Sequence, residues 1–295
     1  MRSARYLALL SGGVSLAAVA VLLSGCAASP GVQTTSGQVL NFEHIHELVA
    51  GQKGGGLLVG THVGLFRLTI DGAGSATAVG PIGGLDFDPM GFTITNGIAY
   101  ASGHPGPTTP TTFGSPDLGL ITSTDLGRSW RNVSLMGTTD FHGLAVMTAS
   151  GGTPHVFGYD AGTQRLRRSL DGGVTWTDGP LLVARDLLAV GDLLYATTPD
   201  GLAVSRDDGL TFAIDSTAPA LYLIAADQQG TLAGVAVNGR TWSQTSGQSW
   251  VPGLSVTGTA QALAVDGRTI YVADDRGIAS ADAGGSSWTV LAVHK

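Results

Sequence analysis

The sequence predicts an all-β protein of the β-propeller class, a ring of four-stranded sheets called blades. An eight-residue pattern recurs along the chain: Ser, any residue, Asp, any residue, Gly, any residue, Ser or Thr, then an aromatic. Its closing aromatics lie 46, 36, 38 and 38 residues apart, at Trp130, Trp176, Phe212, Trp250 and Trp288. Such a period is the length of one propeller blade. No helical period follows residue 30, and 45 of 295 residues are Gly, as turn-rich β proteins require.

The repeated pattern has a structural reason. Asp in a tight turn accepts hydrogen bonds from nearby backbone N–H groups, Gly adopts the positive φ that side chains forbid, and the aromatic packs between sheets. Three copies are complete, at residues 123–130, 169–176 and 205–212, and two depart from the pattern, at 243–250 and 280–288. We therefore expect structural roles for the turn aspartates Asp125, Asp171, Asp207 and Asp282 and for the five aromatics.

Laying each repeat out as four strands gives six blades, the first of them over residues 44–79 without a proper copy of the pattern. Seven blades remain open if the segments around Val39 or Asp86 contain a further sheet. The expected organisation is a signal peptide over residues 1–25, a tether over 26–40 and the propeller over 41–295.

The N-terminal segment predicts export and membrane anchoring. Arg2 and Arg5 precede an apolar stretch that ends in Leu23-Ser24-Gly25-Cys26, which resembles the bacterial lipobox. The resemblance implies cleavage before Cys26, lipidation of that residue and a position at the outer face of the bacterial cell membrane. Cys26 is the one cysteine, so it has no internal disulfide partner. A plain secretory signal or an N-terminal membrane helix is the alternative.

Charge excludes some partners. Removal of the expected signal peptide takes away Arg2 and Arg5. The remaining chain has 13 basic and 22 acidic residues, a formal net charge of −9. A negative chain is a poor ligand for nucleic acid, and no phosphate-binding loop is present. We expect a monomer whose partners are a glycan or protein ligand in the cell envelope and the membrane through its lipid.

Successive strands of a blade run in opposite directions, so the turns of every blade lie at two distinct ends. The turn between strands three and four, which carries the pattern, lies at one end. The start of the innermost strand and the turn between strands two and three lie at the other. Five histidines, Asp140 and Tyr159 map to this second end, and we expect them to bind a ligand at the channel mouth; the histidines are His44, His46, His62, His104 and His142.

Several chemistries fit this cluster. Imidazoles and carboxylates together suit Zn or Cu, and they suit sugar binding or acid–base work equally. Each His could instead cap a strand end by bonding to backbone. If the protein is an enzyme, Asp88, Asp140 and Asp186 are the candidates for a catalytic carboxylate pair.

The repeats resemble the Asp-box, or bacterial neuraminidase repeat. Together with fragments such as Asp140-Phe141-His142-Gly143, they make the chain similar to exported bacterial propellers labelled sialidase-like or glycosylhydrolase. That resemblance implies the fold and, as one alternative, glycoside hydrolysis. The nearest fragment to the sialidase Phe-Arg-Ile-Pro motif is Phe66-Arg67-Leu68-Thr69, which lacks the Pro. The leading hypothesis is therefore a binding protein, with a glycoside hydrolase and a metal-binding envelope protein as alternatives.

The lipid anchor gives a first prediction. Replacing Cys26 with Ala removes the acylation site, and acyl chains supply the apolar burial that holds the chain at a membrane. We expect Cys26→Ala to move the protein out of the membrane fraction of fractionated cells. Equal membrane retention of the variant and the wild type would favour an uncleaved helix instead.

Overall fold

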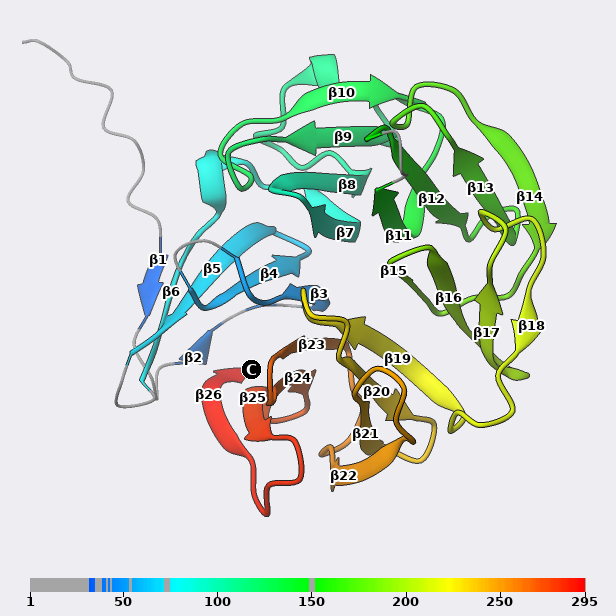
Figure 1. The fold of residues 1–295 in the computed structure, drawn as a ribbon. Coiled ribbons are helices and arrows are strands. Elements are labelled where there is room, and N and C mark those ends of the chain that lie inside the picture. The colour runs from blue at the N-terminus through cyan, green and yellow to red at the C-terminus, as the bar shows by residue number, and fades with distance from the viewer. Residues whose placement is uncertain are drawn as a thin grey trace, which may run out of the picture. The chain divides into compact units, whose positions relative to one another are not determined.

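Six antiparallel sheets follow one another along the chain and close into a ring, as Figure 1 shows. The structure is a computed structural model, and it describes residues 32–34, 39–40, 42, 44–52, 55–71, 75–148 and 152–294. The predicted signal peptide and Cys26 lie outside these residues. The prediction of an all-β, six-bladed propeller with four-stranded blades is confirmed.

Each of the first three blades is a meander in which sequence neighbours pair. Their strands are β3 (Ile45–Val49), β4 (Leu57–Thr61), β5 (Gly64–Ile70) and β6 (Ala76–Gly80); β7 (Asp88–Thr95), β8 (Ile98–His104), β9 (Leu120–Ser123) and β10 (Arg131–Ser134); and β11 (Phe141–Thr148), β12 (Pro154–Asp160), β13 (Arg165–Ser169) and β14 (Thr177–Leu181).

The last three blades repeat the same order. Their strands are β15 (Asp186–Val190), β16 (Leu193–Thr198), β17 (Gly201–Ser205) and β18 (Ala213–Ile214); β19 (Leu221–Ala226), β20 (Leu232–Ala236), β21 (Arg240–Gln244) and β22 (Val251–Ser255); and β23 (Ala262–Asp266), β24 (Thr269–Asp274), β25 (Gly277–Asp282) and β26 (Thr289–His294).

Two short strands near the N-terminus extend the first and last blades. β1 (Val32–Thr34) pairs antiparallel with β6, and β2 (Val39–Leu40) pairs parallel with β26. Both fall within the residues that we expected to form the tether, so sheet pairing begins before residue 41. Because β2 joins the sixth blade, and the segment before Asp86 forms the 3-10 helix η1 (Ile82–Gly84), the described residues leave no seventh sheet.

Apolar side chains fill the space between neighbouring blades, in one cluster for each interface among the described residues. Four closing aromatics pack against the blade that precedes their own: Trp130 against the first, Trp176 against the second, Phe212 against the third and Trp250 against the fourth. Trp288 does the same against the fifth. Between the sixth and first blades, Phe42 and Phe66 meet edge to face with their ring centroids 5.0 Å apart.

The three complete copies of the pattern form one repeated structure, here called the Ser–Asp turns (residues 123–130, 169–176 and 205–212). In the second turn, the Ser169 hydroxyl donates to Asp171 at 2.7 Å and accepts from Gly173 N–H at 2.8 Å. Thr175 donates its N–H to Asp171 Oδ1 at 2.9 Å and its hydroxyl to Oδ2 at 2.5 Å. The other two turns have the same bonds within 0.1 Å.

These bonds hold the turn aspartates ionised. The hydroxyl hydrogen bonds, followed by the backbone ones, lower the pKa of Asp125, Asp171 and Asp207 to about 2. A folded pKa below the ordinary value of about 3.9 means that the turns stabilise the fold above about pH 4. That contribution is lost as the pH falls towards 2. The residues therefore act as structural acceptors.

The two irregular copies form different turns. At residues 243–250, where Thr245 replaces Asp, the turn is closed by Gln248 N–H donating to Thr245 C=O at 2.9 Å. Asp282 ends β25, and its carboxylate pairs with Arg268 at 3.2 Å instead of accepting from its own turn in the pattern of the complete copies. This copy is one residue longer than the complete ones, with two glycines, Gly284 and Gly285, in the turn. The added residue changes the length of the turn and accounts for the different contacts.

The inner strands of all six blades line a central cavity of about 1560 Å³. The turns that leave the inner strands lie at one end, and residues 124–126 and Asp208 of the Ser–Asp turns lie with them. The starts of the inner strands lie at the opposite end, because successive strands of each blade are antiparallel. No helix within the described ranges is long and apolar enough to cross a bilayer.

The second prediction concerns the aromatic between blades. Trp176 contacts Phe141 at a centroid distance of 4.9 Å, and its indole N–H donates to Gly173 C=O at 3.0 Å and Ser134 Oγ at 2.9 Å. We expect Trp176→Ala to destabilise the fold by about 3 kcal/mol, through lost burial and a cavity between the second and third blades. Chemical denaturation measures this change.

A matched control lies in the same turn. Val174 is 60% exposed, so Val174→Ala leaves the unfolding midpoint nearly unchanged. Equal midpoints for Trp176→Ala and Val174→Ala would contradict the role of the aromatic.

Candidate functional site

The starts of the inner strands place polar side chains from all six blades around one mouth of the channel. We call this set of side chains the channel-mouth surface. It also includes His62, from a turn, and His104 and Asp117, from a loop, because they contact the residues at the strand starts. Its members are His44, His46, His62, Asp88, His104, Asp117, Asp140, His142, Arg185, Tyr222 and Gln261.

Local irregularities in the inner strands help to aim these side chains. The register shifts between Ile45 and Glu47, and again between Phe141 and Gly143, so His46 and His142 each stand at a β-bulge. Tyr222 and Met90 stand at the equivalent bulges of β19 and β7. A bulge leaves its extra residue unpaired and turns the side chain out of the alternating pattern.

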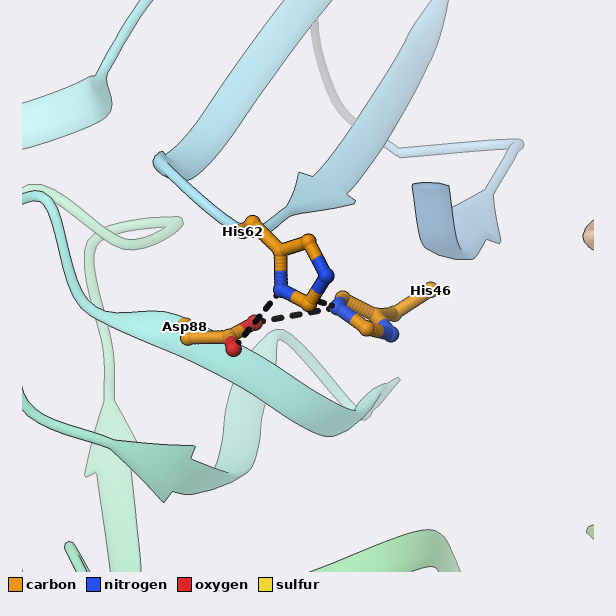
Figure 2. A group of neighbouring side chains, drawn as sticks. All are labelled: His46, His62 and Asp88. Carbon is orange, nitrogen blue, oxygen red and sulfur yellow. Dashed lines mark hydrogen bonds and ion pairs between the residues drawn. The ribbon is translucent and has the colours of Figure 1, made fainter. Parts of the chain in front are cut away.

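The first part of the surface is a triangle of two imidazoles and a carboxylate. Figure 2 shows His46 from β3, His62 from the turn between β4 and β5, and Asp88 at the start of β7. The Nδ1 atom of His62 is 2.8 Å from Asp88 Oδ2, and His46 Nε2 is 3.0 Å from Asp88 Oδ1. The two ring nitrogens are 3.1 Å apart. His44 lies beside them, with ring centroids 4.9 Å from His46 and 5.5 Å from His62.

The second part joins the second and third blades. His142 Nε2 is 2.7 Å from Asp140 Oδ2, and His104 Nε2 is 3.5 Å from the same oxygen. His104 also reaches Asp117 at 3.7 Å and, through Nδ1, Asp88 at 4.0 Å, so it links the two parts. Its side chain is 45% exposed and available to a ligand.

The long loop after β8 is held in place by its own hydrogen bonds. Gly103 lies at φ +145°, and a Cβ there would stand 1.9 Å from the Asp88 carbonyl oxygen, so only Gly permits this pairing of β7 with β8. Leu118 N–H donates to Gly103 C=O at 2.8 Å, and Thr108 N–H donates to the Asp86 carboxylate at 2.9 Å. These bonds fix His104 and Asp117 beside Asp140.

The opposite side of the mouth carries the cation Arg185. Its guanidinium donates to the Tyr222 hydroxyl at 3.1 Å and to Gln261 C=O at 3.3 Å, and it stacks over the Tyr222 ring. Beneath it lie two carboxylates of the channel wall, Glu47 and Asp186. Burial raises the pKa of Glu47 well above its usual range, the Asp186 carboxylate raises it further, and Arg185 opposes both. Burial also raises the pKa of Asp186, and the Ile224 N–H and Arg185 oppose that effect.

The histidines of the surface differ in their electrostatics. Burial, followed by the positive charges of His46 and His62, lowers the pKa of His44. The hydrogen bond with Asp140 raises the pKa of His142 against the opposing effect of burial. Burial opposes ionisation of Asp88, but its contacts with His46 and His62 outweigh burial and lower its pKa. The surface therefore combines a carboxylate of lowered pKa, Asp88, with imidazoles whose pKa values are shifted in opposite directions, downward at His44 and upward at His142.

The sequence-predicted residues separate into two groups. The structure brings the five histidines and Asp140 together at the channel mouth, with Asp88 among them. Tyr159 is 7% exposed and packs in the apolar cluster between the third and fourth blades, so it does not join the surface. Asp186 lies in the channel wall, where its carboxylate accepts from Ile224 N–H at 2.9 Å.

Sequence reasoning missed Asp117, Arg185, Tyr222 and Gln261. Three of them occupy the inner-strand starts of the fourth, fifth and sixth blades, which the same strand layout could have identified. Asp117 is brought in by the fold of a loop, which no period in the sequence reveals. His155 pairs with Asp208 at 2.8 Å beside a Ser–Asp turn, at the other end of the channel.

Comparison with known proteins supports the fold. No protein-family model matches the chain. A xyloglucanase of Hypocrea jecorina (strain QM6a) is 30% identical in an alignment over 203 residues. The match covers 62% of this chain and about a fifth of that protein's length, 21%.

Solved structures share the fold at low sequence identity. A chain of the nidogen/laminin complex aligns with a TM-score of 0.54 at 15% identity, over 76% of this chain and 88% of its own. The virginiamycin B lyase of Staphylococcus aureus aligns with a TM-score of 0.50 at 13% identity, over 88% of each chain. These similarities concern the fold alone.

The third prediction concerns His142. Its folded pKa is raised, so the pair with Asp140 stabilises the fold below the ordinary histidine value of about 6.5 and loses this effect as the pH rises through the folded pKa. We expect NMR titration to find His142 above the ordinary range. Asp140→Asn removes the acceptor charge and lowers that pKa.

His155 serves as the internal control, since its partner Asp208 lies at the other end of the channel. The chemical shifts of the His155 ring should be the same in Asp140→Asn and in the wild type. A His142 pKa that Asp140→Asn leaves unchanged would contradict the assigned cause.

Proposed function

We propose that this protein is an exported, lipid-tethered Asp-box propeller that binds a ligand in the cell envelope through its channel-mouth surface. The observation that carries the proposal is the convergence of polar side chains from all six inner-strand starts on one mouth of the channel. The opposite end carries the Ser–Asp turns, whose carboxylates are already saturated with hydrogen bonds. We therefore place the ligand at the channel mouth, where the polar side chains of the six blades converge.

The chemistry of the surface suits a polar, hydroxyl-rich ligand. His62, His104 and His142 are each more than 40% exposed on their side chains, and a neutral imidazole offers one donor and one acceptor. Asp88 and Asp140 add acceptors, Arg185 adds donors, and the Tyr222 ring adds an aromatic face. The sequence similarity to a xyloglucanase favours a glycan over a protein as the ligand.

A glycoside hydrolase is the second candidate, and the carboxylates of the channel wall favour it. Such enzymes pair a protonated carboxyl group with an ionised one. Glu47 could supply the protonated group, because burial and the Asp186 carboxylate raise its pKa well above the usual range. Burial also raises the pKa of Asp186, while Arg185 lowers the pKa of both carboxyl groups and so favours ionisation of one of them. Asp88 and Asp140 contact imidazoles, which fits them better for binding.

The lipobox-like segment that ends at Cys26 supports an envelope location. A lipidated Cys would hold the propeller at the membrane, where it meets extracytoplasmic glycans. The negative charge of the chain means that this attachment would owe little to attraction by anionic lipids.

The fourth prediction tests ligand binding. We expect the purified protein to bind xyloglucan or other cell-wall oligosaccharides on a glycan array. The double variant His104→Ala, His142→Ala should weaken binding at least about tenfold, because each lost hydrogen bond to a ligand contributes on the order of 1 kcal/mol. His155→Ala is the control, since it removes a histidine at the other end of the channel.

Analysis of the sugars after incubation separates the two candidates. Unchanged oligosaccharides indicate a binding protein, and shortened ones indicate a hydrolase. Absence of binding to every arrayed glycan, or binding that the double variant retains in full, would contradict a glycan-binding channel mouth.

A further inference from the structure

The triangle of His46, His62 and Asp88 holds three contacts that protons alone cannot satisfy together. A ring nitrogen carries either one proton or one lone pair, and an ionised carboxylate only accepts. If both nitrogens are protonated, two N–H groups face each other across 3.1 Å. If only one is protonated, the lone pair of the other faces a carboxylate oxygen at 2.8 or 3.0 Å. While Asp88 is ionised, each of these proton arrangements leaves one side of the triangle repulsive.

A second observation concerns the Asp88 carboxylate itself. Its Oδ1 atom is buried and has no hydrogen-bond partner of good geometry, although His46 Nε2 lies 3.0 Å away. A buried acceptor without a partner costs about 1–3 kcal/mol. A cation between the three residues would meet this oxygen and both nitrogen lone pairs at once.

The spacing of the atoms fits a small divalent ion. A tetrahedral ion with bonds of about 2.0–2.1 Å has ligand atoms roughly 3.3 Å apart. The two ring nitrogens are 3.1 Å apart, close to this spacing. Each nitrogen lies 2.8 or 3.0 Å from a different oxygen of Asp88, so a small shift of the carboxylate would present one oxygen to the ion. One ligand atom from each residue already lies within 4.8 Å of the other two.

The donor set selects the kind of metal. Two imidazole nitrogens and one carboxylate oxygen suit zinc and neighbouring transition metals, whereas Ca²⁺ and Mg²⁺ prefer oxygen ligands alone. Three protein ligands leave a fourth position open, and the 42% exposure of His62 puts it within reach of solvent. His104 Nδ1, 4.0 Å from Asp88 Oδ2, lies next to that position.

We propose that His46, His62 and Asp88 bind one divalent transition-metal ion of the zinc type at the channel mouth, with an open position directed to the ligand. The ion would link the first blade, which supplies both histidines, to the second, which supplies the carboxylate. This inference deepens the proposed function, because the metal would anchor the ligand there, but the metal site itself depends only on the geometry of these three residues.

The fifth prediction tests the metal alone. Full-length protein stripped with a chelator is titrated with Zn²⁺ by calorimetry, and bound metal is counted by elemental analysis. We expect one Zn²⁺ per chain. His62→Ala and Asp88→Asn should each raise the Kd at least about 100-fold, since loss even of an outer-shell partner of a metal ligand costs 10–100-fold. Co²⁺ should give the intense visible absorption of a low-coordinate site in the wild type only.

The matched control is His155→Ala, which removes a histidine that pairs with an aspartate at the same 2.8 Å distance as His62. It should bind Zn²⁺ like the wild type. Asp88→Asn preserves side-chain shape, and circular dichroism verifies that each variant is folded. Absence of Zn²⁺ binding by the wild type would overturn the proposal. So would a Zn²⁺ affinity in folded His62→Ala and Asp88→Asn equal to that of the wild type.

The metal and ligand experiments fail independently. Zinc binding without glycan binding supports the metal site and contradicts the proposed function. Glycan binding without zinc binding supports the proposed function and contradicts the metal site.

Discussion

The antiparallel order of four strands within each blade is the constraint on which the rest of the structure depends. It sends every turn between strands three and four to one end of the ring and every inner-strand start to the other. At the first end, the carboxylates of the Ser–Asp turns accept hydrogen bonds from within their own turns, as Asp171 does from Ser169 and Thr175. At the second end, Asp88 and Asp140 each keep a buried carboxylate oxygen without a hydrogen-bond partner.

Packing between blades makes this division rigid. Each closing aromatic lies against the preceding blade, and Phe42 with Phe66 completes the last interface. Since the sheets are locked side by side, residues distant in sequence meet at fixed separations: His46 and Asp88 are 42 positions apart and touch at 3.0 Å. The bulges at His46 and His142 then turn individual side chains toward the mouth. A rigid scaffold with locally irregular inner strands can thus build a site without a dedicated motif.

Repeats made the fold predictable, and the lack of repeats made the site harder to predict. The five aromatics recur at blade spacing, which predicted a propeller of six blades and left a seventh open. Strand counting also placed the five histidines on one end, where the structure brings them together. It could not reveal that Tyr159 would fold into the core or that a loop would bring in Asp117, because both depend on packing. Arg185 and Gln261 were overlooked because their blades carry no histidine there.

The position of a bound zinc ion tests the functional assignment of the two ends most directly. A crystal of the zinc-loaded protein, measured on both sides of the zinc absorption edge, locates the ion without reference to side-chain assignment. We expect one dominant anomalous peak about 2.0–2.2 Å from His46 Nε2, His62 Nδ1 and an Asp88 oxygen. A dominant peak at the Ser–Asp turns or at His155, or no peak in the described part of the chain, would contradict the account.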